Sequence, residues 1–228
     1  MKAEEDAKIS SCPIQLLFLR SRWINEYPAL GAKRFEELAS YYSEPHRYYH
    51  TLWHIADFLN EFEEVPLVLK PRERKAACLA VWYHDAVYNP TKNDNEEQSA
   101  LIAESHLTQA GMSDIIGEVL PLIIATKHIH LPENELEDMI VDADLSILGR
   151  DNDKYRHYAH AIRQEYSMYS EKDYRSGRAT FMAKFLKRKN LFHTTYFQGK
   201  YETMARKNLT EELDFLRGKR PLKEYCPL

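Results

Sequence analysis

The chain has 228 residues, 44% of them hydrophobic and 29% charged, which is typical of a globular protein long enough to bury its own core. Its net charge of −4, from 31 basic and 35 acidic side chains, provides no basic surface for nucleic acid or anionic lipid. Three scattered cysteines, an acidic N-terminus and short apolar runs argue against disulfides, a signal peptide and membrane spans, and predict a cytoplasmic protein.

Apolar residues recur three and four positions apart through most of the chain, which is the helical period. Glycine accounts for seven of the 228 residues, about 3% of the chain against a usual share of ~7%, so turn-rich β folds are disfavoured. The pattern predicts an all-α protein of about nine or ten helices, in a single domain that spans residues 1–228. We expect its core at about 13–217 and an irregular tail, with two prolines, at 218–228.

Amphipathic stretches and capping signals place these helices along the chain. The first four stretches are residues 11–24, 34–42, 50–62 and 72–88. The signals are Pro71 in a first turn, Asp94 with Glu97 as a capping box, Ser113 with Asp114, Asn134 opening a helix that ends at Leu148 with Gly149 as its stop, Asp151, Ser170, and a last helix from about Phe197 to Arg217.

Two histidines lie four residues apart in the string YYHTLWHIADF (48–58). If this stretch is helical, His50 and His54 share one face and can point at one centre. A neutral imidazole binds metal, whereas a protonated one can give a proton to a leaving group, so the two rings can have different roles. His46 falls on the same stripe, and we interpret it as a solvated first-turn histidine rather than a further lining residue.

The pair His84-Asp85 follows the core-like residues 80–82 in AVWYHDAVY (80–88). Neighbours on a helix point about 100° apart, so a shared ion would lie between the two side chains. A buried His-Asp hydrogen bond without metal is the alternative. Asp144, in IVDADLSILG (140–149), would supply a ligand from another helix. Imidazole and carboxylate without thiolate suit a divalent cation (Mn, Mg, Ni, Co, Fe or Zn) at a catalytic centre.

This spacing resembles the signature of the HD superfamily of metal-dependent phosphohydrolases, which is one His, a His-Asp pair and a distant Asp. The string YHTLWHIADF is similar to a stretch of the cyclic-nucleotide phosphodiesterases, and ADLS (143–146) to the stretch that carries their last metal aspartate. Longer strings resemble an uncharacterised bacterial branch of predicted HD-type hydrolases, over about Pro13 to Arg217. These strings are PHRYYHTLWHI, WYHDAVYNPTKNDNEEQSA, DADLSILG, IRQEY and ARKNLTEEL.

The resemblance implies an HD-type helical fold with four metal ligands, which are His54, His84, Asp85 and Asp144. It implies that His50 faces the substrate. Asp142 competes with Asp144, but two residues apart on a helix cannot face the same way, so Asp142 is expected to support the site or cap a helix.

Acidic and basic side chains after the His-Asp pair are further candidates. Glu96 could orient the attacking water or hold a second cation, whereas Glu97 is more plausibly used in the helix cap. Lys127 could meet a phosphate. His128 and His130 are expected to end a helix, where they could bind a second metal, as in some HD proteins, or simply complement the helix dipole.

Two further groups stay ambiguous. Arg163, Arg178 and Arg206, with Tyr166, could clamp a phosphate or form interhelical salt bridges with Glu165 or Glu211. His157 and His160 are three residues apart, as in some zinc sites, but their polar neighbours favour a solvated face.

The sequence therefore predicts a metal-dependent hydrolase, most plausibly a phosphohydrolase with a small phosphorylated substrate such as a phosphate ester or nucleotide. Asp85 is expected to help orient the attacking water and His50 to assist the leaving group. Two rivals are an HD-fold di-iron oxygenase, with His128 and His130 as extra ligands, and a non-catalytic metal- or nucleotide-binding sensor. Neither nucleic acid nor a membrane is an expected partner, and a homodimer is left open.

Overall fold

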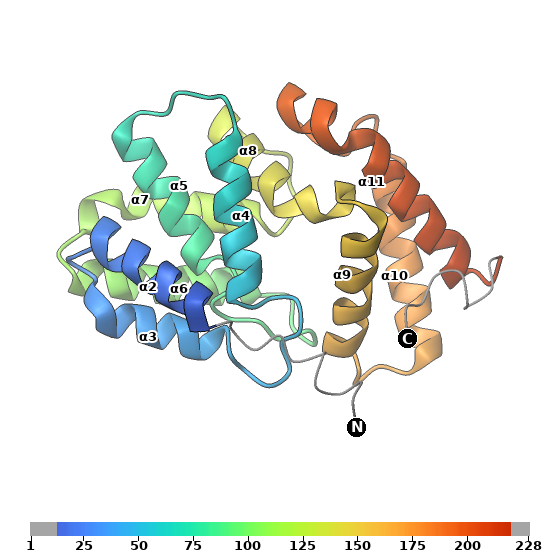
Figure 1. Cartoon of the computed structure of the whole chain (residues 1–228), viewed down its shortest axis with the longest axis horizontal. Helices are drawn as coiled ribbons and strands as arrows, with labels where there is room; N and C mark the ends of the chain where they lie inside the picture. The colour runs from blue at the N-terminus through green and yellow to red at the C-terminus, as the bar shows by residue number, and fades with distance from the viewer. Residues whose placement is uncertain (1–12, 220–228) are drawn as a thin grey trace. The chain divides into compact units, whose positions relative to one another are not determined.

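The computed structural model describes residues 13–219, which contain ten α-helices and no strand (Figure 1). The prediction of an all-α fold with nine or ten helices is confirmed. Within this range no helix is long and apolar enough to cross a membrane. Most of the predicted tail, residues 220–228, and two of the three cysteines, Cys12 and Cys226, lie outside the described residues.

The chain divides into two compact units, Met1–Val141 and Asp142–Leu228, and the boundary falls inside helix α8 (Glu135–Asp144). The single domain expected from the sequence stays a prediction. The residues expected to surround the His-Asp pair, from His46 to Lys127, all belong to the first unit.

The first unit is built around a set of buried aromatic rings. Its helices are α2 (Pro13–Glu26), α3 (Gly31–Tyr41), α4 (Leu52–Glu64), α5 (Pro71–Tyr83), α6 (Asn95–Gln109) and α7 (Ile116–Ala125), with a 3₁₀ turn at Ser113–Ile115. Trp23 of α2 meets Trp82 of α5 edge to face, with ring centroids 5.3 Å apart. Helix α5 is buried from Ala76 to Tyr83, so the chain reaches His84 from the centre of the unit.

The second unit contains a 3₁₀ segment (Leu145–Gly149) and helices α9 (Asn152–Glu165), α10 (Glu171–Leu186) and α11 (Thr195–Leu216). Helix α11 packs on the 3₁₀ segment and on α10. The interior of the second unit contains a buried ion pair. Arg178 donates to the buried Glu212 at 2.9 Å, and the Tyr155 hydroxyl donates to the same carboxylate at 2.6 Å.

Most of the predicted helix starts are confirmed. Pro71 is the first residue of α5. The side-chain oxygens of Asn134, Asp151 and Ser170 each accept a backbone N–H in the first turn of their helices. The predicted capping box at Asp94 is wrong, since Asp94 makes no side-chain cap bond and Glu97 pairs with a lysine instead.

Gly149 was expected as a helix stop, but the structure gives it a different role. Helix α8 ends at Asp144, and the chain continues as a 3₁₀ turn that includes Gly149. A Cβ atom at this position would lie 2.8 Å from the backbone oxygen of Tyr201 and 2.9 Å from its Cα. The glycine therefore permits the close approach of the 3₁₀ segment to α11.

We expect Gly149→Ala to lower the free energy of unfolding by roughly 1–3 kcal/mol, because backbone must shift to admit the methyl group. Gly177→Ala is the matched control. Gly177 is exposed inside α10 with no atom near a Cβ, so alanine there should stabilise by about 0.5–1 kcal/mol. Urea unfolding of both variants measures the difference, and equal shifts in the same direction would contradict the packing role.

Candidate metal centre

His54 lies in the first turn of α4 and is buried. The helix begins at Leu52, because Thr51 has extended backbone and its side chain accepts the N–H of Trp53 at 3.3 Å. His50 therefore lies in the turn before the helix, and the expectation that His50 and His54 share one helix face is wrong. The two rings are still neighbours, with centroids 5.8 Å apart.

The pair His84-Asp85 lies at the end of α5 rather than inside it. The helix ends at Tyr83, His84 is its C-cap, and Asp85 belongs to the following turn. His84 keeps helical backbone angles, with φ of −54° and ψ of −37°. The two side chains nevertheless approach each other, with His84 Nε2 and Asp85 Oδ2 3.0 Å apart.

Three ligand atoms meet at one point in this unit. His54 Nε2 lies 3.1 Å from His84 Nε2 and 3.7 Å from Asp85 Oδ2. Ligands at ~2.1 Å from one ion and roughly 90–110° apart are separated by about 3.0–3.4 Å, so two of the three separations fit and the third is slightly long. His54, His84 and Asp85 could therefore hold a metal ion.

The orientation of His84 suits a ligand. Its Nδ1 lies 2.9 Å from the carbonyl oxygen of Val81, which can only accept a hydrogen bond. Nδ1 must therefore carry a proton, which leaves Nε2 as the ring nitrogen that faces the other two side chains and that can bind a metal. A backbone partner that fixes the ring in this way is usual for metal-binding histidines.

The Asp85 side chain is only 13% exposed, yet it stays ionised. Burial alone would raise the pKa of its carboxyl group, but the neighbouring imidazoles of His84, His50 and His54 hold that pKa well below its ordinary value. An anionic oxygen therefore faces two imidazole nitrogens, and this is the donor set that a divalent cation needs.

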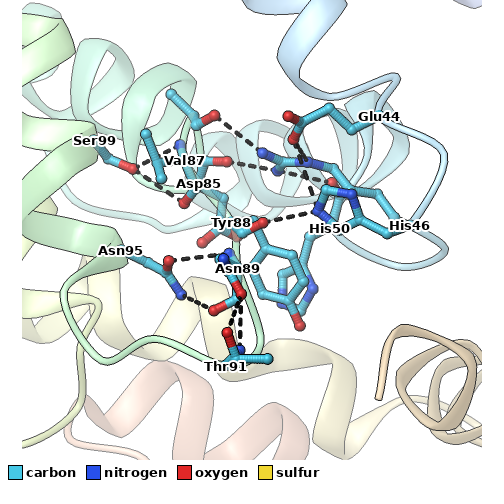
Figure 2. Close-up of polar contacts among 12 residues, drawn as sticks. Glu44, His46, His50, Asp85, Val87, Tyr88, Asn89, Thr91, Asn95 and Ser99 are labelled. Carbon is cyan, nitrogen blue, oxygen red and sulfur yellow. Dashed lines mark hydrogen bonds and ion pairs between the residues drawn. The ribbon is translucent and has the colours of Figure 1, made fainter. Parts of the chain in front are cut away.

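His50 and His46 both contact Tyr88, in the segment that follows Asp85 (Figure 2). The His50 ring stacks on the Tyr88 ring with centroids 4.1 Å apart. His46 is half-buried, and its Nε2 lies 2.8 Å from the Tyr88 carbonyl oxygen. His46 is thus a loop-holding residue rather than the freely solvated histidine that the sequence suggested.

The other side of this segment is fastened to α6 (Figure 2). The Ser99 hydroxyl accepts the N–H of Val87 at 3.0 Å. The Asn95 side chain accepts from Asn89 N–H at 3.0 Å and donates to the Asn89 carbonyl at 3.1 Å. The irregular segment after Asp85 is therefore held from two sides.

Glu96, at the start of α6, lies within electrostatic reach of Asp85. Burial raises the pKa of Glu96, and the charge of Asp85 raises it further, whereas Lys127 opposes the shift. The Lys127 Nζ atom is 4.0 Å from the Glu96 carboxylate and hydrogen bonds to Glu97. The sequence singled out Glu96 and Lys127 separately, and the structure brings them together.

Asp142 and Asp144 lie in the second unit. The buried Asp142 carboxylate accepts the N–H groups of His193 and Thr194, at 2.8 and 2.7 Å, and the Thr194 hydroxyl at 2.8 Å. It thus anchors the start of α11, which agrees with the capping role considered for it. Asp144 is the last residue of α8 and remains the predicted fourth ligand.

His128 and His130 follow α7, which ends at Ala125, so the expectation that they end a helix is wrong. His128 has a left-handed backbone, with φ of 55°. Across residues 13–219, the three-residue set of His54, His84 and Asp85 is the only such group of potential metal ligands that lie together. A second ion at His128 or His130 stays a prediction.

The three arginines considered as a phosphate clamp form ion pairs in the second unit, which is the other interpretation left open. Arg163 pairs with Glu171 and Arg178 with Glu212. Arg206 pairs with Glu202, so none of these partners is the Glu165 or Glu211 named from the sequence. His157 and His160 are exposed, as predicted.

Comparison with known proteins found no matching family model, no match among curated proteins and no match among solved structures.

Proposed function

We propose that this protein is a metal-dependent hydrolase of the HD type, and that it acts on a small phosphate ester or nucleotide. The observation that carries the proposal is the convergence of His54 Nε2, His84 Nε2 and Asp85 Oδ2 within 3.7 Å of one another. The likeness of the sequence motifs to the HD superfamily supports the same assignment.

The protein would supply the ligands and their orientation. His54 and His84 would bind as neutral imidazoles, Asp85 as a carboxylate, and Asp144 is proposed as the fourth ligand. When bound, a divalent cation supplies Lewis acidity, which acidifies water and polarises a phosphoryl oxygen. The low exposure of the three converging side chains supports this role, because a water-poor site strengthens every electrostatic interaction in it.

Three side chains near the centre are proposed to handle protons and substrate. His50, beside His54 and electrostatically coupled to Asp85, would give a proton to the leaving group. Glu96, whose pKa is raised, would orient and deprotonate the attacking water. Lys127, close to Glu96, would meet a phosphate oxygen.

The direct test is a screen of the metal-loaded protein against phosphomonoesters, nucleotides and phosphodiesters. We expect phosphate-ester hydrolysis that requires added manganese, nickel, cobalt or magnesium and disappears with chelator. Lys127→Ala should mainly raise KM if the ammonium meets the phosphate, because uniform binding affects KM and not kcat.

His157→Ala, on an exposed helix face of the second unit, is the control and should leave hydrolysis unchanged. Oxygen consumption by an iron-loaded sample, with no hydrolysis of any substrate, would replace the proposal by the oxygenase alternative. Metal and nucleotide binding without turnover of the whole panel would favour the sensor.

A further inference from the structure

Arg47 is a buried arginine that the sequence motifs did not single out. Its side chain is 0% exposed, and it lies in the segment between α3 and α4. It donates to the Glu44 carboxylate at 2.9 Å and to three backbone carbonyls, those of His50 at 3.2 Å, Asp85 at 2.6 Å and Ala86 at 3.0 Å. One guanidinium therefore joins the turn before α4 to the turn after α5.

These carbonyls belong to the residues whose backbone the helices do not fix. Asp85 and Ala86 lie beyond the last residue of α5, and His50 lies before the first residue of α4. The segment after Asp85 is held by His46 and by α6, and the Tyr42 hydroxyl bonds the Asp85 backbone. Arg47 is the side chain that binds the Asp85 carbonyl oxygen, and its positive charge also suits the carbonyl end of α5.

The surroundings of Arg47 require a guanidinium in particular. A buried cation is costly unless its donors are paired, and here Glu44 supplies the opposite charge. The rings of Tyr42 and Tyr88 flank the cation, with centroids 5.2 and 5.5 Å from its central carbon. Lysine has one donor centre on a flexible stem, so it cannot make the same fork of bonds.

We propose that Arg47 is a positioning residue of the metal centre. By fixing the Asp85 carbonyl, it holds the Asp85 carboxylate 3.0 Å from His84 Nε2, the spacing at which both can bind one ion. The hydrogen bonds of Arg47 described above reach one carboxylate and three backbone carbonyls rather than the ligand side chains, so its effect on metal binding is indirect. This inference rests on the proposed metal-dependent function.

The test measures Co²⁺ affinity and the visible absorption of bound Co²⁺ in Arg47→Lys and Arg47→Met. Residues that orient metal ligands typically contribute 10–100-fold to affinity, so we expect roughly that loss in both variants. The visible spectrum should also change, because Asp85 would bind at an altered geometry or not at all. The melting temperature of the metal-free proteins is measured alongside.

Arg206 offers a matched control within the same chain. Its guanidinium also donates to one glutamate, Glu202, and to three backbone carbonyls, but in the second unit. Arg206→Lys and Arg206→Met should lower the melting temperature while leaving Co²⁺ affinity and spectrum unchanged. A loss of Co²⁺ affinity that follows stability alone would scale with the fall in melting temperature in both pairs of variants.

Wild-type affinity and spectrum in Arg47→Lys would overturn the inference, as would equal losses of affinity in the Arg206 variants. If Arg47→Met does not fold, Glu44→Gln replaces it, since it weakens the guanidinium's ionic partner at a half-exposed site and should reduce affinity by a smaller factor. If the wild-type protein binds Co²⁺ but hydrolyses no phosphate ester, the proposed function is wrong, whereas the inferred role of Arg47 in metal binding is unaffected. A wild-type protein that binds no Co²⁺ overturns both.

Discussion

Divalent metal ions should raise the melting temperature of chelator-treated protein by roughly 5–10 °C. The three converging ligands come from α4 and from the end of α5, so they meet only in the folded chain. An ion present at a hundred times its dissociation constant then stabilises by about 2.7 kcal/mol, and a chain of this length gains roughly 2–4 °C per kcal/mol. Calorimetry with and without Mn²⁺ or Co²⁺ measures the shift.

Asp85→Asn should remove most of this rise, because the amide keeps the shape of the side chain but loses the anionic oxygen. Asp57→Asn is the control within the same unit, since Asp57 is exposed on α4 less than one turn after the ligand His54. An undiminished metal-dependent shift in Asp85→Asn would remove Asp85 from the ligand set. Elemental analysis of each purified variant provides a second, independent reading.

His54→Ala should lose metal and hydrolysis together, whereas His50→Ala should keep most of its metal and lose activity on the order of 10²-fold. The structure separates these residues, because only His54 belongs to the converging ligand set. The His50 ring lies before the helix and stacks on Tyr88. Metal content and kcat are measured for both variants.

The activity lost in His50→Ala should depend on the substrate. A leaving group such as nitrophenolate needs little protonation, so the defect should be milder there than on an alkyl phosphate. An equal defect on both substrates would argue against proton donation by His50. If His50→Ala empties the site and His54→Ala leaves it full, the two roles must be exchanged.

The helices were predictable because their apolar faces recur with the helical period, and the starts at Pro71, Asn134, Asp151 and Ser170 carry local signals. The helix ends next to the candidate site could not be predicted from the sequence. The periodic pattern continues through His50 and through His84-Asp85, although the backbone leaves the helix at both places. Apolar spacing does not record where the hydrogen-bond ladder stops.

The same limit applies to the site. His54, His84 and Asp85 could be named from the sequence because side-chain chemistry and spacing carry the signal. Arg47 could not, because three of its four partners are backbone carbonyls, which every residue has. The pairing of Lys127 with Glu96 and Glu97 also escaped prediction, since it joins residues about thirty positions apart.

The buried aromatic centre of the first unit has a consequence for how unfolding can be observed. All three tryptophans of the chain, Trp23, Trp53 and Trp82, lie in that unit, and two of them pack edge to face. Tryptophan fluorescence therefore reports on the first unit alone, whereas far-ultraviolet circular dichroism sums the helices of both. Coincident transitions by the two probes would mean that both units melt cooperatively, and separate transitions would give each its own stability.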